Sequence, residues 1–145
     1  MRSLFRIVRS AGRLETRELT AALRALGWLT MMRVAVRVVP YATVARIGPR
    51  IRPRHDRPHR LTPHQCRRAI ERAARVIPGA ACLPRALAAD CLLRREGHVS
   101  TLSLGVVMGD DRQLRAHAWV DSGGVRVAGG DEAAQYRPLA ARPEP

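Results

Sequence analysis

The sequence predicts an α+β fold in which helices come first and a small antiparallel sheet follows. Apolar residues recur at helical spacing through residues 14–47, 62–77 and 83–96. After Gly97 the pattern changes to short runs rich in β-branched residues, and the last two of these runs flank a glycine turn. Helices followed by strands, rather than alternating with them, are typical of α+β proteins.

The N-terminal segment, residues 1–47, is predicted to be helical and is rich in arginine. Thr16 can cap a helix, and Leu19, Leu23 and Leu26 recur at helical spacing after it. We expect these helices to pack on the rest of the domain with their arginines facing outward. The alternative is an exposed apolar stripe that docks on a partner or on a membrane.

Residues 48–61 are predicted to form a linker between this segment and the main domain. They hold three prolines among many arginines, a composition that cannot continue a helix. His55 and His59 lie four residues apart, the spacing of a metal pair on a helix, but Pro53 and Pro58 argue against a helix there. The sequence therefore favours a solvated linker over a metal site.

The chain is strongly basic. All 26 of its basic residues are arginines, the net charge is +14, and residues 1–60 account for +11 of it, with 14 arginines against three acids. Such a surface favours an acidic partner, which could be a nucleic acid, a membrane surface, or an acidic peptide or protein. A nucleic-acid-binding module is one alternative, but few aromatics are present for stacking on bases and no nucleic-acid motif is found.

The distribution of charge and cysteine suggests a location. The longest uncharged run, residues 97–109, has 13 residues, whereas a membrane-spanning helix needs about 20. The N-terminus has no apolar run of signal-peptide length. Three cysteines do not form a disulfide framework, and none of them belongs to a C-x-x-C pair that would indicate zinc. We expect a soluble cytoplasmic protein with reduced thiols, no membrane span, no metal and no cofactor.

Residues 62–77 carry a clear helix start. Thr62 is expected to cap the helix and Pro63 suits its first position, while a Pro-Gly pair ends it. Cys66 falls on the apolar stripe of this helix. It is therefore predicted to be a small core residue.

The next helix contains the other two cysteines, and helical phase separates them. Cys82 and Cys91 are nine residues apart, which at about 100° per residue places them on opposite faces. Leu83, Leu87 and Cys91 follow the spacing of a core stripe, so Cys91 is predicted to be buried and inert. Asp90 is expected at the edge of that stripe, near water.

Cys82 is predicted to lie at the start of this helix. It precedes Pro84, and proline lacks an N–H group and is tolerated only in the first helical turn. The free N–H groups of a helix start stabilise a thiolate, and they can also hold the oxyanion of an attacked carbonyl. Cys82 is therefore a candidate nucleophile, provided that a base lies nearby.

His117 is the best candidate for that base. It lies within the strand pattern "AHAWV", where His117, Trp119 and Asp121 share one face. A cysteine at a helix start followed by a histidine on a strand is the arrangement of papain-like thiol enzymes. The alternative is a structural histidine.

The residue that orients the histidine is expected in the next strand. A three-residue Ser-Gly-Gly loop would pair Asp121 with Val125 and place His117 opposite Gly129, which has no carboxylate. Asp131 lies two residues further on the same face and could reach diagonally. Asp121 is about 13 Å along the strand from the histidine. Asp131 is therefore predicted as the third catalytic residue, with Asp121 as the alternative.

The segment "ACLPRALAADCLLRREGHVSTLSLGV", followed by "AHAWVDSGG", resembles the transglutaminase-like leader peptidases of lasso-peptide biosynthesis. The resemblance covers about residues 60–138, so we expect a core domain over residues 62–138 and a tail over 139–145. It implies a transglutaminase-like, papain-like cysteine protease fold with N-terminal helices. By position, Cys82 would be the nucleophile and His117 the general base and acid. The family's third residue, usually Asp, falls at Gly129, a departure that Asp131 would have to compensate.

The resemblance also implies partners. The substrate would be the leader-bearing precursor peptide, cut before a separate asparagine-synthetase-like cyclase closes the ring. The leader is typically presented by a small recognition-element protein, and we expect it here as a separate partner. A catalytically impaired transglutaminase-like scaffold is the alternative that Gly129 favours.

Overall fold

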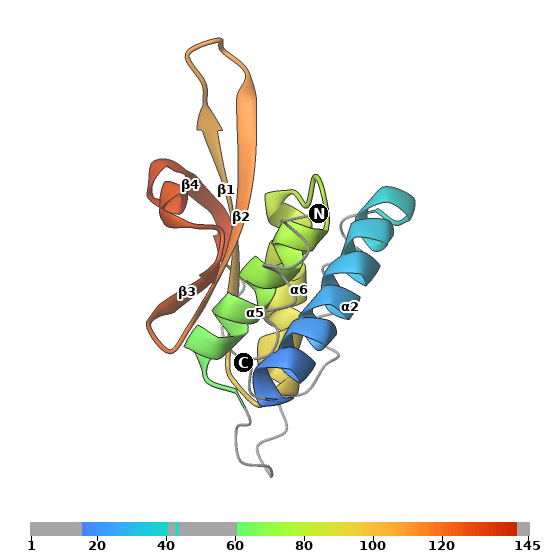
Figure 1. Ribbon diagram of the computed structural model, residues 1–145. Coiled ribbons are helices and arrows are strands. Elements are labelled where there is room, and N and C mark those ends of the chain that lie inside the picture. The colour runs from blue at the N-terminus through green and yellow to red at the C-terminus, as the bar shows by residue number, and fades with distance from the viewer. Residues whose placement is uncertain (1–15, 41–42, 44–60, 142–145) are drawn as a thin grey trace, which may run out of the picture.

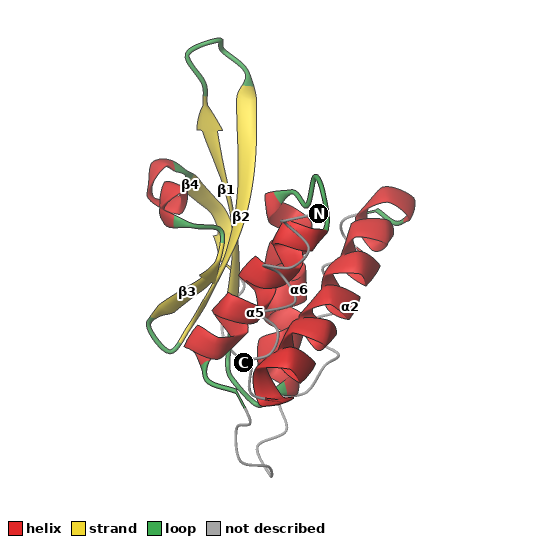
Figure 2. Cartoon of the chain, in the orientation of Figure 1, coloured by secondary structure: helices red, strands yellow, loops and turns green. Residues whose placement is uncertain are grey.

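The computed structural model describes residues 16–40, 43 and 61–141, and within them a layer of helices packs on one face of an antiparallel sheet (Figures 1 and 2). In chain order the elements are α2 (Thr16–Val38), α5 (Pro63–Val76), α6 (Cys82–Arg95), β1 (Thr101–Met108), β2 (Leu114–Ser122), β3 (Val125–Ala128), the 3-10 helix η1 (Asp131–Gln135) and β4 (Arg137–Ala141). The predicted α+β fold is confirmed.

The helix starts follow from local sequence. Thr62 caps α5 with a reciprocal pair of hydrogen bonds, in which the Gln65 backbone N–H donates to the Thr62 hydroxyl and the Thr62 N–H donates to the Gln65 side chain. Leu61, the last residue of the predicted linker, is buried in the core, and the ring of His98 contacts its carbonyl oxygen at 2.6 Å. The predicted linker residues 48–60 lie outside the described part of the chain.

Helix α2 packs on α5 and α6 through a stripe of two small and two large apolar residues. The stripe consists of Ala21, Ala25, Leu29 and Met32. Leu19 and Leu23, whose spacing indicated the helix, are exposed. Alanines suit the contact because they let helices approach closely. The expected packing of this segment on the domain is confirmed for residues 16–38.

Among the described helices, α2 alone is long and apolar enough to cross a membrane by length and composition. Core helices of soluble proteins and signal sequences meet the same criterion, and the inner stripe of α2 belongs to the core. The opposite face keeps large apolar side chains exposed, among them Met31, Val34 and Val38. The cytoplasmic location therefore stays a prediction.

The sheet has the order β3-β2-β1-β4. The β2–β3 turn is shorter than expected, since Ser122 pairs with Val125 and Asp121 pairs with Arg126. The predicted three-residue loop, with Asp121 opposite Val125, is therefore wrong. The predicted place of Gly129 opposite His117 is wrong too, because Val120 pairs with Ala128 and Gly129 lies against Trp119. Gly123 and Gly124 both have positive φ, of 54° and 76°, and such a pair closes a two-residue hairpin turn.

Asp90 is the other residue whose environment differs from the expectation. Helical phase predicts a position near water, but Asp90 is fully buried, at 0% exposure, and so is most of Arg94, at 3%. The Asp90 Oδ1 atom accepts hydrogen bonds from Arg94 Nε at 3.0 Å and from the Ser100 hydroxyl at 2.6 Å. The carboxylate can be buried because a cation one helical turn later on the same face and a hydroxyl both bind it.

Candidate active site

Cys82 is the first residue of α6, as predicted. Ala81 supplies no side-chain cap, and Pro84 sits in the first turn, where its missing N–H costs no hydrogen bond. The thiol is half-buried, and its Sγ atom lies 4.0 Å from the carbonyl oxygen of Ala116 in β2. The start of α6 therefore meets β2 at the residue that precedes His117.

His117 lies on β2 opposite Gly105 of β1, and aromatic rings hold its imidazole. The ring stacks on Tyr136, with centroids 4.9 Å apart and planes at 25°, and more distantly on Trp119, at 6.3 Å and 22°. Its Nε2 atom lies 2.6 Å from the carbonyl oxygen of Gly129. No other hydrogen bond to this ring exists within the described residues.

Gly105 makes room for this aromatic group. A Cβ atom at position 105 would lie 2.8 Å from Cβ of Tyr136 and 2.9 Å from the ring of Trp119, closer than real Cβ contacts. Tyr136 comes from the segment between η1 and β4, which the sequence analysis did not identify. The glycine inside an otherwise branched strand pattern, "TLSLGVVM", was the available signal of a close approach.

The two carboxylates that could supply the third catalytic group lie in different places. Asp121 is engaged by Arg126, whose Nε lies 2.8 Å from Oδ1 and whose Nη2 lies 3.3 Å from Oδ2. Asp131 is the first residue of η1, and its side chain lies outside the part of the chain that the structure describes. Its catalytic role therefore stays a prediction.

The other two cysteines are buried in the core, which confirms their predicted placement. Cys66 is 0% exposed and Cys91 is 1% exposed. Burial raises the pKa of the Cys66 thiol to about 12; the negative charge of Glu96 adds to the rise and Arg24 opposes it. Cys66 is thus an uncharged thiol at neutral pH. Because the thiolate is the form that reacts, Cys66 is expected to be inert.

We expect iodoacetamide to alkylate Cys82 alone in the native protein at pH 8, and all three cysteines in urea. Peptide mass mapping would locate the label. Labelling of native Cys66 at pH 8 would contradict this assignment.

The raised pKa of Cys66 also predicts how the free energy of unfolding depends on pH. The contribution of the buried, protonated thiol is complete below its ordinary pKa of 9.0 and is lost as the pH rises toward about 12, so the native protein should become easier to unfold over that range.

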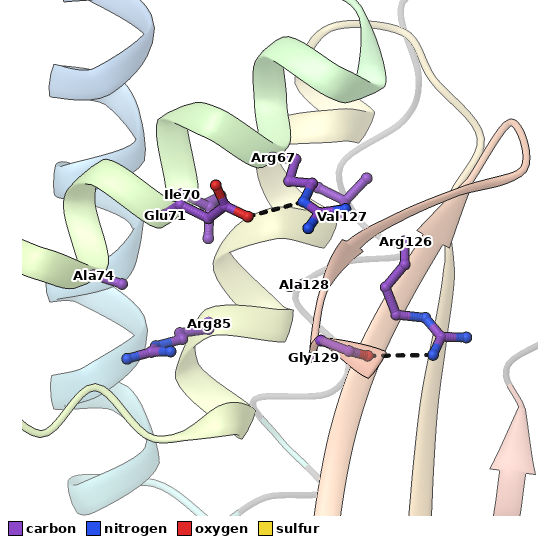
Figure 3. Close-up of a pocket in the computed structure, with 10 residues that line it drawn as sticks. Arg67, Ile70, Glu71, Ala74, Arg85, Arg126, Val127, Ala128 and Gly129 are labelled. Atoms are coloured by element: carbon purple, nitrogen blue, oxygen red, sulfur yellow. Dashed lines mark hydrogen bonds and ion pairs between the residues drawn. The ribbon is translucent and has the colours of Figure 1, made fainter. Parts of the chain in front are cut away.

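A pocket of about 190 Å³ adjoins the site (Figure 3). Gly129, the residue whose carbonyl contacts His117, lines it together with apolar residues of α5 and β3. Three arginines line it: Arg67 pairs with Glu71 at 2.8 Å and Arg126 pairs with Asp121, whereas Arg85 has no ion-pair partner among the described residues. The pocket can therefore receive an acidic group beside Gly129, the residue that contacts His117.

Comparison with known proteins places these features in a family. The sequence model of the family described as "Transglutaminase-like superfamily" matches residues 26–141. The matched span begins inside α2, ends with β4, and contains Cys82 and His117. No curated protein and no solved structure matches the chain.

Proposed function

Because the chain belongs to the transglutaminase-like superfamily, a group of cysteine-protease-like proteins, we propose that it is the cysteine peptidase that removes the leader from a lasso-peptide precursor. The observation that supports a peptidase best is the approach of the Cys82 helix start to the strand that carries His117. The motifs around these two residues support the leader peptidases in particular, since they resemble that family over both segments.

The proposed reaction is acyl transfer to the thiol. His117 takes the proton of Cys82, and the thiolate attacks the carbonyl carbon at the leader–core junction. The free N–H groups at the start of α6 bind the oxyanion. The peptide C–N bond then breaks as His117 protonates the leaving amine, which frees the N-terminus of the core peptide. Water attacks the thioester, releases the leader carboxylate and restores the thiol.

The proposed partners follow from this chemistry. The freed amine is the group that a separate asparagine-synthetase-like cyclase would join to a side-chain carboxylate. A separate recognition-element protein would present the leader. The arginine-rich composition, with a net charge of +14, supports docking of an acidic leader or partner.

The test is to incubate the protein with a candidate precursor and its recognition protein and to weigh the products. We expect two new masses that sum to the precursor plus one water, and a core peptide with a free N-terminus. Full conversion should not require metal or nucleotide. A precursor that stays intact with the recognition protein present would refute the proposed activity.

Arg85 provides a more specific prediction about the substrate. It lies three residues after Cys82 and lines the pocket without an ion-pair partner among the described residues. We expect Arg85→Glu to raise KM roughly tenfold for a precursor with an acidic residue near the cleavage site, while kcat changes less than about threefold, because a charge-assisted contact is lost.

Arg17→Glu is a matched control for this charge reversal. Arg17 is exposed in the first turn of α2, and the start of α2 lies at the opposite end of the helix layer from the start of α6, where Cys82 is found (Figure 1). Its neighbour Glu18 pairs with Arg68 and Arg72 of α5. The Arg17→Glu substitution changes the net charge by the same amount as Arg85→Glu. Equal effects of the two variants on KM would show general electrostatics rather than a contact in the pocket.

A further inference from the structure

A backbone carbonyl contacts the Nε2 atom of His117, and it belongs to the position where the leader peptidases that the sequence resembles have an acid. The Nε2 atom of His117 lies 2.6 Å from the Gly129 oxygen. We propose that Gly129 is the positioning residue of the Cys82–His117 pair, with its carbonyl oxygen in place of the third carboxylate. The hydrogen bond stands on its own, whereas its importance for turnover rests on the proposed peptidase function.

The carbonyl determines which nitrogen of the imidazole carries the proton. A carbonyl oxygen only accepts hydrogen bonds, so in the neutral ring Nε2 must be the protonated nitrogen that donates to it. Nδ1 then keeps its lone pair, and no described residue hydrogen-bonds to it. The ring is thereby prepared as a base at Nδ1, while stacking on Tyr136 restricts its rotation.

The backbone at position 129 accepts only glycine. Its φ is +102°, a conformation that L-residues rarely adopt. A Cβ atom there would lie 2.3 Å from Cβ of Trp119, 2.7 Å from Cα of Trp119 and 2.9 Å from the Ala118 carbonyl oxygen. Two of these atoms belong to the backbone of β2, so they cannot move away without displacing the strand. An aspartate at position 129 is therefore incompatible with the path that brings this carbonyl to His117.

A neutral carbonyl performs part of the work of a carboxylate. Both are acceptors, so both fix the same tautomer and ring orientation. The carbonyl carries no full negative charge to stabilise the imidazolium that forms when His117 takes the thiol proton. Gly129 therefore explains how the histidine is held without requiring a carboxylate from Asp131.

The tautomer can be read directly by NMR, with no substrate. In histidine-labelled protein at alkaline pH, long-range ¹H–¹⁵N correlations should show His117 protonated on Nε2 and bare on Nδ1, with its signals identified by their absence in His117→Gln. Asp131→Ala, which removes any side-chain acceptor at that position, should leave this pattern unchanged. A ring protonated on Nδ1, or a tautomer that shifts in Asp131→Ala, would overturn the proposal.

Two changes at the carbonyl test its effect on turnover. Glycolic acid in place of Gly130 converts the amide after Gly129 into an ester, whose carbonyl is a weaker acceptor in the same position. We expect kcat to fall roughly three- to tenfold with KM nearly unchanged. The same ester at Gly124, in the hairpin turn, should have no effect. Gly129→Asp, although it restores the family's acid, should lower kcat at least about tenfold.

The outcomes separate this proposal from the proposed function. An unchanged kcat in the ester variant, together with a loss of more than about tenfold in Asp131→Ala, would assign the role to Asp131. Higher activity in Gly129→Asp would also overturn the role of the carbonyl. If no precursor is cleaved by the unmodified protein, the peptidase function fails, while the NMR tautomer still decides whether Gly129 orients His117.

Discussion

Replacing Cys82 with alanine should abolish cleavage of the precursor and leave the fold intact. The change removes the only thiol that is both half-buried and at a helix start, whereas Cys66 and Cys91 are enclosed in the core. Loss of a catalytic nucleophile typically lowers kcat by several orders of magnitude, and we expect at least about 10³-fold. Mass spectrometry of a timed digest would measure the residual rate.

The expected effect on stability is small, because the Cys82 thiol makes one polar contact among the described residues, a long one of 4.0 Å to Ala116. Cys91→Ala is the matched control. It should still cut the precursor but melt at a lower temperature, since it leaves a cavity in the core. Cleavage by Cys82→Ala at the unmodified rate would refute the assignment of the nucleophile.

A double variant adds a sharper criterion. If Cys82 and His117 act as one unit, Cys82→Ala combined with His117→Ala should be no slower than Cys82→Ala alone, because the first change already removes the covalent route. Losses that multiply would show that the two residues contribute independently. That result would favour a structural role for His117.

Replacing Asp90 with alanine should destabilise the fold strongly, by about 3–5 kcal/mol. The variant removes the counter-charge of Arg94, which is 3% exposed and whose Nη2 also donates to the Ser100 carbonyl at 3.2 Å. A buried guanidinium without a carboxylate bears most of its desolvation cost. Urea unfolding followed by circular dichroism would measure the free energy of unfolding.

The Arg67–Glu71 pair is a matched control with the same spacing along a helix. Its side chains are 46% and 47% exposed, so Glu71→Ala should cost no more than about 0.5 kcal/mol. The double change Asp90→Leu with Arg94→Met should recover much of the lost stability, because it removes both buried charges together. If Asp90→Ala costs as little as Glu71→Ala, Arg94 does not depend on Asp90 as its counter-charge.

Several features of the fold could be predicted because they depend on neighbouring residues. The start of α5 followed from Thr62 and Pro63, and the start of α6 followed from Pro84, which placed Cys82 at the helix start. Helical phase likewise placed Cys82 and Cys91 on opposite faces of α6. Backbone geometry and side-chain period act within a few residues, so a sequence states them directly.

Features that depend on distant segments could not be predicted in this way. The β2–β3 register differs from the expectation because the turn has two residues and a bulge follows between Val120 and Asp121. Asp90 is buried because its partners include Ser100, in the segment after the helix. Periodicity places a residue on a face, but only the folded chain shows what covers that face.

The sequence by itself determined the α+β class, the helix-start position of Cys82, the strand position of His117 and the buried positions of Cys66 and Cys91. Only the tertiary structure decided what contacts the imidazole. Tyr136 reaches His117 across the space left by Gly105, and Gly129 offers a carbonyl where a side chain was sought. The reason is physical: a backbone carbonyl is present at every residue, so the sequence cannot show where one points.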